Sequence, residues 1–109
     1  MFRTRSQRRK NCWECPVART ADLVGDTWSI LIVRDLLRGP KRFTDLQDSL
    51  SGVSSRTLAK KLQFLESQSL LARRAFAEKP PRVEYRLTAK GREFSGIISA
   101  MRRYGERYL

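Results

Sequence analysis

The spacing of hydrophobic residues predicts a central helix in the first third of the chain. Residues 27–38 are apolar on nearly every side, and Asp26 stands where its carboxylate can cap the first turn. A shorter helix is expected over residues 16–24, because Pro16 suits a first helical turn and Gly25 ends the pattern. The helix that is apolar all round should lie in the middle of the fold.

A second pair of helices follows, separated by a turn. The segment from Thr44 to Gln47 has capping-box spacing and predicts a short helix that ends near residue 50. Small residues at 51–54 predict a turn that ends in a hydroxyl cap, and residues 55–68 then carry leucines at helical spacing. The buried face of this longer helix is marked by Leu58, Leu62 and Leu65. The pattern is typical of a helix-turn-helix.

The last third of the chain changes from a strand pattern to a helical one. Residues 83–87 alternate between apolar and polar, and together with residues 70–76 they predict a hairpin whose two adjacent prolines make a rigid tip. Thr88 is placed to cap a final helix over residues 89–108. The apolar stripe of that helix is made of Phe94, Ile97, Ile98, Met101, Tyr104 and Tyr108.

These elements define the expected fold class, which is α+β and mostly α: a winged helix-turn-helix domain with a C-terminal dimerisation helix. A chain of 109 residues has room for one compact domain, which we expect over residues 12–109. Residues 1–11 are basic, polar and aperiodic, which predicts a disordered arm. Whether that arm enters a minor groove or only keeps the protein in solution is left open.

The net charge of +12 is concentrated in two segments. Residues 1–11 carry five cations and no acid, and residues 54–92 carry ten cations against three acids. Solvated surfaces usually mix the two signs, so a one-signed stretch of this length indicates a binding surface for a polyanion. Nucleic acid is favoured over an anionic membrane, because the basic segment is predicted to be a helix and a hairpin rather than one long amphipathic helix.

The residue types that the chain lacks exclude several functions. The sequence has no histidine and two cysteines, Cys12 and Cys15, so histidine-based catalysis is impossible and one chain cannot complete a four-ligand zinc site. It contains no glycine-rich phosphate loop and no apolar run long enough to cross a bilayer. We therefore expect a cytoplasmic protein that is not an enzyme and that needs no cofactor or metal.

The rotation of the helix at residues 55–68 decides which cations face outward. At about 100° per residue, the side chains of Arg56, Thr57 and Lys60 fall on the half of the helix away from the leucines. Lys61 flanks the leucine stripe and can turn either way. Arginine and lysine donate to guanine O6 and N7, so this outer face is expected to read bases in a major groove.

The start of this helix and the hairpin supply the other candidate contacts. A helix N-terminus offers free N–H groups and partial positive charge, so Ser54, Ser55 and the backbone beside them are expected to hold a phosphate. Cations on the hairpin are expected to position the DNA backbone. The complete candidate DNA-binding set is Arg42, Ser54, Ser55, Arg56, Thr57, Lys60, Lys61, Arg73, Arg74, Lys79 and Arg82.

From Cys15 to about Gly105 the chain resembles the HxlR-type winged-helix regulators, bacterial relatives of the MarR-type group. The resemblance is carried by Cys15-Pro-Val17, Gly25-Asp-Thr-Trp28, Leu37-Arg-Gly-Pro40, Gly52-Val-Ser-Ser-Arg56 and, most specifically, Pro80-Pro-Arg-Val-Glu-Tyr-Arg-Leu-Thr88. It implies a homodimer that is joined through the first and last helices and binds palindromic operator DNA.

The predicted dimer interface combines the helices at 16–24 and 89–108. The apolar stripe of the last helix would be exposed in a monomer, which independently favours dimerisation, with packing on its own domain as the alternative. The interface set is Val17, Ala21, Val24, Phe94, Ile97, Ile98, Met101, Tyr104 and Tyr108.

The resemblance also implies that Cys15, which stands directly before the proline, is a candidate sensor of oxidants or electrophiles. A helix N-terminus, with Arg19 one turn along, would stabilise a thiolate there. The alternative is a small, partly buried structural cysteine. Cys12 departs from the family pattern, and its position leaves open a resolving thiol, half of a metal site between subunits, or no role.

The sequence predicts a sequence-specific transcriptional regulator that binds double-stranded DNA. We expect it to act as a repressor whose activity is controlled by an effector that the sequence does not identify. One alternative is an RNA-binding or ribosome-associated protein, although the basic helix offers only Phe64 as an aromatic platform for unstacked bases. Another is a winged domain that binds proteins, but its basic face should then be neutral, and it is not. A cationic face that is merely solvated is the third.

Overall fold

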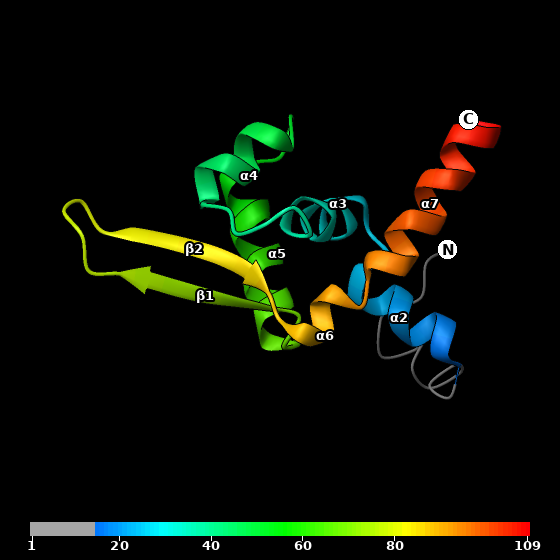
Figure 1. Ribbon diagram of the computed structural model, residues 1–109, viewed down its shortest axis with the longest axis horizontal. Helices are drawn as coiled ribbons and strands as arrows, with labels where there is room; N and C mark the ends of the chain where they lie inside the picture. Colours follow the sequence, from blue (N-terminus) through cyan, green and yellow to red (C-terminus); the bar gives the residue numbers. More distant parts are fainter. Residues whose placement is uncertain (1–14) are drawn as a thin grey trace.

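The computed structural model describes residues 15–109, and it places a two-stranded hairpin and a pair of helices at opposite ends of a helical core (Figure 1). In chain order the elements are α2 (Pro16–Val24), α3 (Thr27–Leu36), α4 (Phe43–Ser49), α5 (Ser55–Ser67), β1 (Leu71–Phe76), β2 (Arg82–Leu87), α6 (Ala89–Arg92) and α7 (Ser95–Tyr108). This order confirms the predicted fold class, a mostly helical winged helix-turn-helix. Within residues 15–109, no helix combines the length and the apolar character that a membrane span requires.

Helix α3 is the central element of the core, as predicted. Asp26 caps it, because the Asp26 Oδ1 accepts a hydrogen bond from the N–H of Ser29 at 3.0 Å. Ile32 and Val33 are fully buried, and the helix contacts α2, α4, α5 and α7. It ends at Leu36, two residues before the predicted end, and the chain then turns at Gly39 with a φ of 133°, a conformation that favours glycine.

Helix α4 does not have the predicted cap at Thr44. Its N-cap residue is Arg42, whose N–H donates to Oδ2 of Asp45 at 2.9 Å. A carboxylate three residues into the helix therefore satisfies a donor at the cap, and the helix begins two residues earlier than the hydroxyl pattern indicated. Leu46 is fully buried and fixes α4 against the core.

The hairpin is anchored at its base and projects away from the core (Figure 1). The two strands pair antiparallel, from Leu71 opposite Leu87 to Phe76 opposite Arg82. Leu71 and Leu87 are buried, whereas the strand ends near the tip are not. At the base, the backbone of Lys41 exchanges two hydrogen bonds with Tyr85, of 2.9 and 2.8 Å, and so joins the hairpin to the segment before α4. The predicted wing is confirmed.

The predicted single helix over residues 89–108 is wrong, because the chain bends between α6 and α7. Thr88 caps α6 as predicted, since its Oγ1 accepts a hydrogen bond from the Gly91 N–H at 3.1 Å. Gly91 lies close against the backbone of Leu70 at the base of the hairpin, and Phe94 is buried in the core. The bend lets α6 keep this contact while α7 runs to the opposite end of the molecule.

Three residues of the predicted dimer interface belong to the protein's own core instead. Val24, Phe94 and Ile98 are only 6, 7 and 8% exposed. The apolar stripe on α7 is wide, so that one edge packs on α3 while the other edge is exposed. The sequence pattern shows the stripe but not which of its residues are buried. The residues of the predicted interface that remain exposed are Val17, Ala21, Ile97, Met101, Tyr104 and Tyr108.

Gly91 is a position where a methyl group should be poorly tolerated. A Cβ there would overlap the carbonyl oxygen of Leu70, so Gly91→Ala is expected to lower the free energy of unfolding by about 2–3 kcal/mol. Gly96→Ala is the matched control, because its Cβ would meet nothing within 4 Å and should stabilise the helix by roughly 0.5–1 kcal/mol. Urea unfolding at one fixed protomer concentration compares them, and equal stabilities would contradict the packing described.

Candidate nucleic-acid interface

The N-terminus of α5 is held firmly and leaves two backbone donors for a ligand. The Ser54 Oγ accepts a hydrogen bond from the Thr57 N–H at 3.1 Å, which confirms the predicted cap. The Gln47 side chain donates to Oγ of Ser55 at 2.7 Å and so ties α4 to the first residue of α5. The N–H groups of Ser55 and Arg56 donate to no other group of the described chain, so they are open to a phosphate oxygen.

The outer face of α5 presents the predicted cations. Leu58, Leu62 and Leu65 are buried, whereas Arg56 and Lys60 are exposed. Neither cation forms an ion pair with a carboxylate in the part of the chain that the structure describes. Their charges are therefore available to an anionic ligand. Thr57 and Phe64 lie on the same helix but are half-buried, so they contribute less to the surface.

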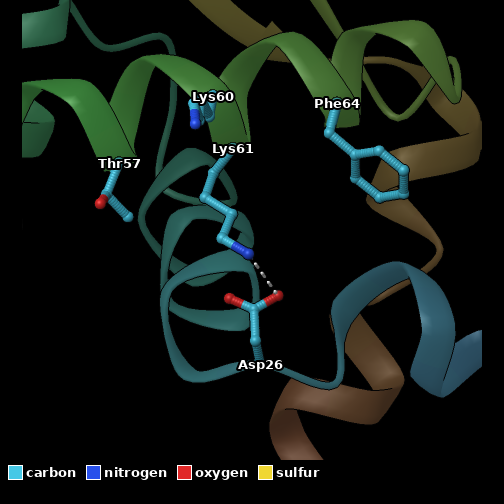
Figure 2. A pocket seen from close by; sticks show the side chains of 5 residues that line it. All are labelled: Asp26, Thr57, Lys60, Lys61 and Phe64. Atoms are coloured by element: carbon cyan, nitrogen blue, oxygen red, sulfur yellow. Dashed lines mark ion pairs between the residues drawn. The ribbon is translucent and has the colours of Figure 1, made fainter. Parts of the chain in front are cut away.

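Lys61, at the edge of this face, forms an ion pair with Asp26. Its Nζ lies 3.4 Å from Oδ2 of Asp26, and the two side chains face each other across a hollow that Thr57, Lys60 and Phe64 complete (Figure 2). Partial burial tends to raise the pKa of Asp26, but the hydrogen bonds of Ser29 and the charge of Lys61 outweigh it and lower that pKa below its ordinary value. The carboxylate therefore stays charged and holds Lys61.

The hairpin carries most of the other predicted cations, and they differ in their partners. Arg73, Arg74 and Lys79 are exposed and form no ion pair among the described residues. Arg82 is half-buried and pairs with two glutamates of the hairpin. Arg86, which was not among the predicted contacts, is also exposed on β2, and its place in the alternation of that strand is the signal that could have shown it.

Arg42 stands apart from α5, the candidate recognition helix. It is exposed at the N-terminus of α4, where its backbone rather than its side chain has the contact with Asp45. The side chain is free to reach a phosphate beside the helix-turn-helix. With this residue, every member of the candidate DNA-binding set has a described position, and all except Lys61 and Arg82 are without an ion pair among residues 15–109.

Cys15 lies at the other end of the molecule, as the N-cap residue of α2. Its side chain is exposed and makes no cap hydrogen bond, while its carbonyl oxygen accepts the N–H of Arg19 at 3.0 Å. The predicted partner Cys12 and the basic arm at 1–11 lie outside the described residues. No group of ligating side chains that could hold a metal ion occurs within the described range.

Comparisons with known proteins all identify transcriptional regulators of the helix-turn-helix class. A family model described as HxlR-like helix-turn-helix matches residues 23–109. The sequence is 42% identical over 95 residues to an uncharacterized HTH-type transcriptional regulator, sll1512, of Synechocystis sp., and the match covers 87% of this chain and 70% of that protein.

Solved structures show the same similarity. A protein of Porphyromonas gingivalis assigned to the MarR family of transcriptional regulators matches with a TM-score of 0.84 at 32% identity, over 88% of this chain and 94% of that one. The oxidized form of the redox regulator HypR matches with a TM-score of 0.83, also at 32% identity, over 87% and 98% of the two chains.

The ion pair between Asp26 and Lys61 makes a testable prediction about charge at this surface. Asn caps helices about as well as Asp, so Asp26→Asn should keep α3 intact while it releases Lys61 toward a ligand. We expect duplex DNA to bind about three- to tenfold more tightly at low salt, with a salt slope steeper by about one. Titrations at several salt concentrations, followed by fluorescence anisotropy, measure both quantities.

Glu106→Gln is the control for this change, because it removes the same charge from an exposed position on α7. Its effect on duplex binding should be small, since screening reduces interactions beyond about 10 Å at 0.1 M salt. An equal gain in both variants would mean that only the net charge of the protein matters.

Proposed function

The chain belongs to the HxlR-like helix-turn-helix family of DNA-binding transcriptional regulators, and from this premise we propose that it acts as a homodimeric repressor on palindromic operator DNA. The observation that carries the proposal is the outer face of α5, where Arg56 and Lys60 are exposed and without an ion pair among the described residues. A helix of this kind fits the major groove, which is about 12 Å wide.

Within each half-site, the contacts divide into readout and positioning. Arg56 and Lys60 donate to guanine O6 and N7, and Thr57 contributes a hydroxyl or methyl contact at the start of the helix. The open N–H groups at the N-terminus of α5 hold a phosphate of the same groove. The wing carries Arg73, Arg74 and Lys79 to the adjacent backbone or minor groove, and Arg42 binds a phosphate beside α4. Family membership favours this duplex reading over the RNA-binding alternative.

The dimer in this proposal forms at the end of the molecule opposite the wing. Helices α2 and α7 lie there together (Figure 1), and the apolar side chains of Val17, Met101 and Tyr104 are 78, 51 and 61% exposed. A second copy that covers them removes this surface from water and places the two copies of α5 about one helical turn of DNA apart. The dimer then represses by occupying promoter DNA in the bacterial cytoplasm.

A thiol switch at Cys15 completes the proposal. The side chain is exposed at the start of α2, beside the surface assigned to the dimer, and HypR, one of the similar structures, is itself named a redox regulator. The Cys15 thiol would exchange with a small disulfide molecule, forming a mixed disulfide and releasing one thiol of that molecule. The added group would push on α2 at the dimer contact and change the separation of the two recognition helices.

Arg56 and Lys79 should behave differently on operator and random duplexes. Arg56→Ala is expected to weaken binding to a selected operator by about 1–3 kcal/mol and binding to random DNA much less, because it removes a base contact. Lys79→Ala should weaken both and reduce the salt slope by about one. Duplexes selected from a random pool and footprinted should show two half-sites about one helical turn apart. Equal losses on both DNAs for Arg56→Ala would remove it from base readout.

The switch has its own test. Oxidised glutathione should lower the operator affinity of the wild-type protein by at least about tenfold, a change of roughly 1.4 kcal/mol, and a reductant should restore it. Cys15→Ser should lose this response, while Cys12→Ser serves as the matched control that retains Cys15. An identical oxidant response in wild type and Cys15→Ser would leave Cys15 a structural residue.

A further inference from the structure

Arg82 differs from the other cations of the wing in that its charged group is fully engaged within the hairpin. Its Nε and Nη2 lie 2.9 and 2.8 Å from Oε2 of Glu78, and its Nη1 donates to Oε2 of Glu84 at 2.9 Å. All three nitrogens of the guanidinium thus contact one of two carboxylates. Its side chain is only 28% exposed.

An aromatic ring occupies the face of the same guanidinium. Phe76 is the residue opposite Arg82 in the strand register, and the Arg82 Cζ lies 4.0 Å from the centre of the Phe76 ring. Arg74 lies against the same ring at 4.7 Å, and its cross-strand neighbour is Glu84. Stacking on a ring and planar pairing with carboxylates are two contacts that suit the flat guanidinium of arginine better than the ammonium group of lysine.

The position of the two glutamates explains why this cluster matters for binding. Glu78 belongs to the tip and Glu84 to β2, so both stand on the part of the hairpin that the proposed function sends to the DNA. A bare carboxylate there would repel phosphates, with little screening at distances below the Debye length of about 10 Å at 0.1 M salt. Arg82 supplies the opposite charge at contact distance to both.

We propose that Arg82 is a positioning residue of the wing, an internal counter-charge that offsets half of the charge of Glu78 and Glu84 and ties the tip to β2, and that it does not itself contact DNA. In this arrangement Arg73, Arg74 and Lys79 make the contacts of the wing with DNA. Arg74 is held in place by the same ring but keeps its own charge unpaired among the described residues. This inference rests on the proposed function, and it replaces the direct phosphate contact that the sequence pattern indicated for Arg82.

The test compares Arg82→Met alone with the triple variant Arg82→Met, Glu78→Gln, Glu84→Gln. Methionine keeps an apolar side chain on the Phe76 ring, so the hairpin stays packed in both. The single variant exposes two uncompensated carboxylates and should bind duplex DNA about tenfold more weakly. The triple variant has neither cation nor carboxylates, and should return to within about threefold of wild type with an unchanged salt slope.

Lys79→Ala, introduced into wild type and into the triple variant, is the matched control for a direct contact. It should lower the salt slope by about one in both backgrounds. If the triple variant instead stays as weak as Arg82→Met and its slope is lower than that of wild type by about one, Arg82 contacts DNA and the inference is overturned. Circular dichroism of each variant confirms that the helices are intact.

Failure of the proposed function has a different outcome in the same experiment. A wild-type protein without salt-sensitive binding to any duplex would overturn the function itself, before any variant is compared. If the wild-type protein binds duplex DNA but the triple variant binds weakly with a salt slope lower by about one, only the proposed role of Arg82 is overturned.

Discussion

The packing of one face of α5 against α3 is the constraint on which the rest of the structure depends. Leu58, Leu62 and Leu65 are at most 1% exposed, and their spacing fixes how the helix is rotated about its axis. A rotation by one residue would bury a cation and expose a leucine, at a cost of several kcal/mol. The contacts that stabilise the core therefore also determine that Arg56 and Lys60 point outward. The same leucines serve the stability of the fold and the orientation of the binding surface.

Sequence spacing predicted the features whose causes lie within a few residues of one another, and it failed where the cause is a distant contact. The caps at Asp26 and Ser54 each depend on an N–H three residues ahead, so they could be found from local pattern. The bend before α7 could not, because the helical period continues through Phe94 and only the contact of Gly91 with Leu70 shows that the chain must turn. The division of the α7 stripe between core and surface depends on where α3 lies, which no local pattern contains.

The same distinction explains which of the candidate cations lack a carboxylate partner among the described residues. Spacing identified the cations correctly as outward residues, but it cannot show which of them meet a carboxylate from another element. The partner of Lys61 is the cap of a different helix, and a partner of Arg82 lies in a tip of irregular backbone. Both acids stand at the edge of the basic surface, where they reduce its charge at two points. The proposed binding surface therefore has fewer free cations than their number in the sequence suggests, which favours selectivity over general attraction to polyanions.

Helix α3 is the element through which the two ends of the molecule can be coupled. It packs against α2 and α7 at the end that holds Cys15, and against α5 at the binding surface, and its interior residues Ile32 and Val33 have no exposed area. A tightly packed helix of ten residues transmits a shift as a rigid body, because the core has no spare volume to absorb it. A change at the start of α2 need not reach α5 through flexible segments. It has only to move α3 against the three leucines that hold the recognition helix in place.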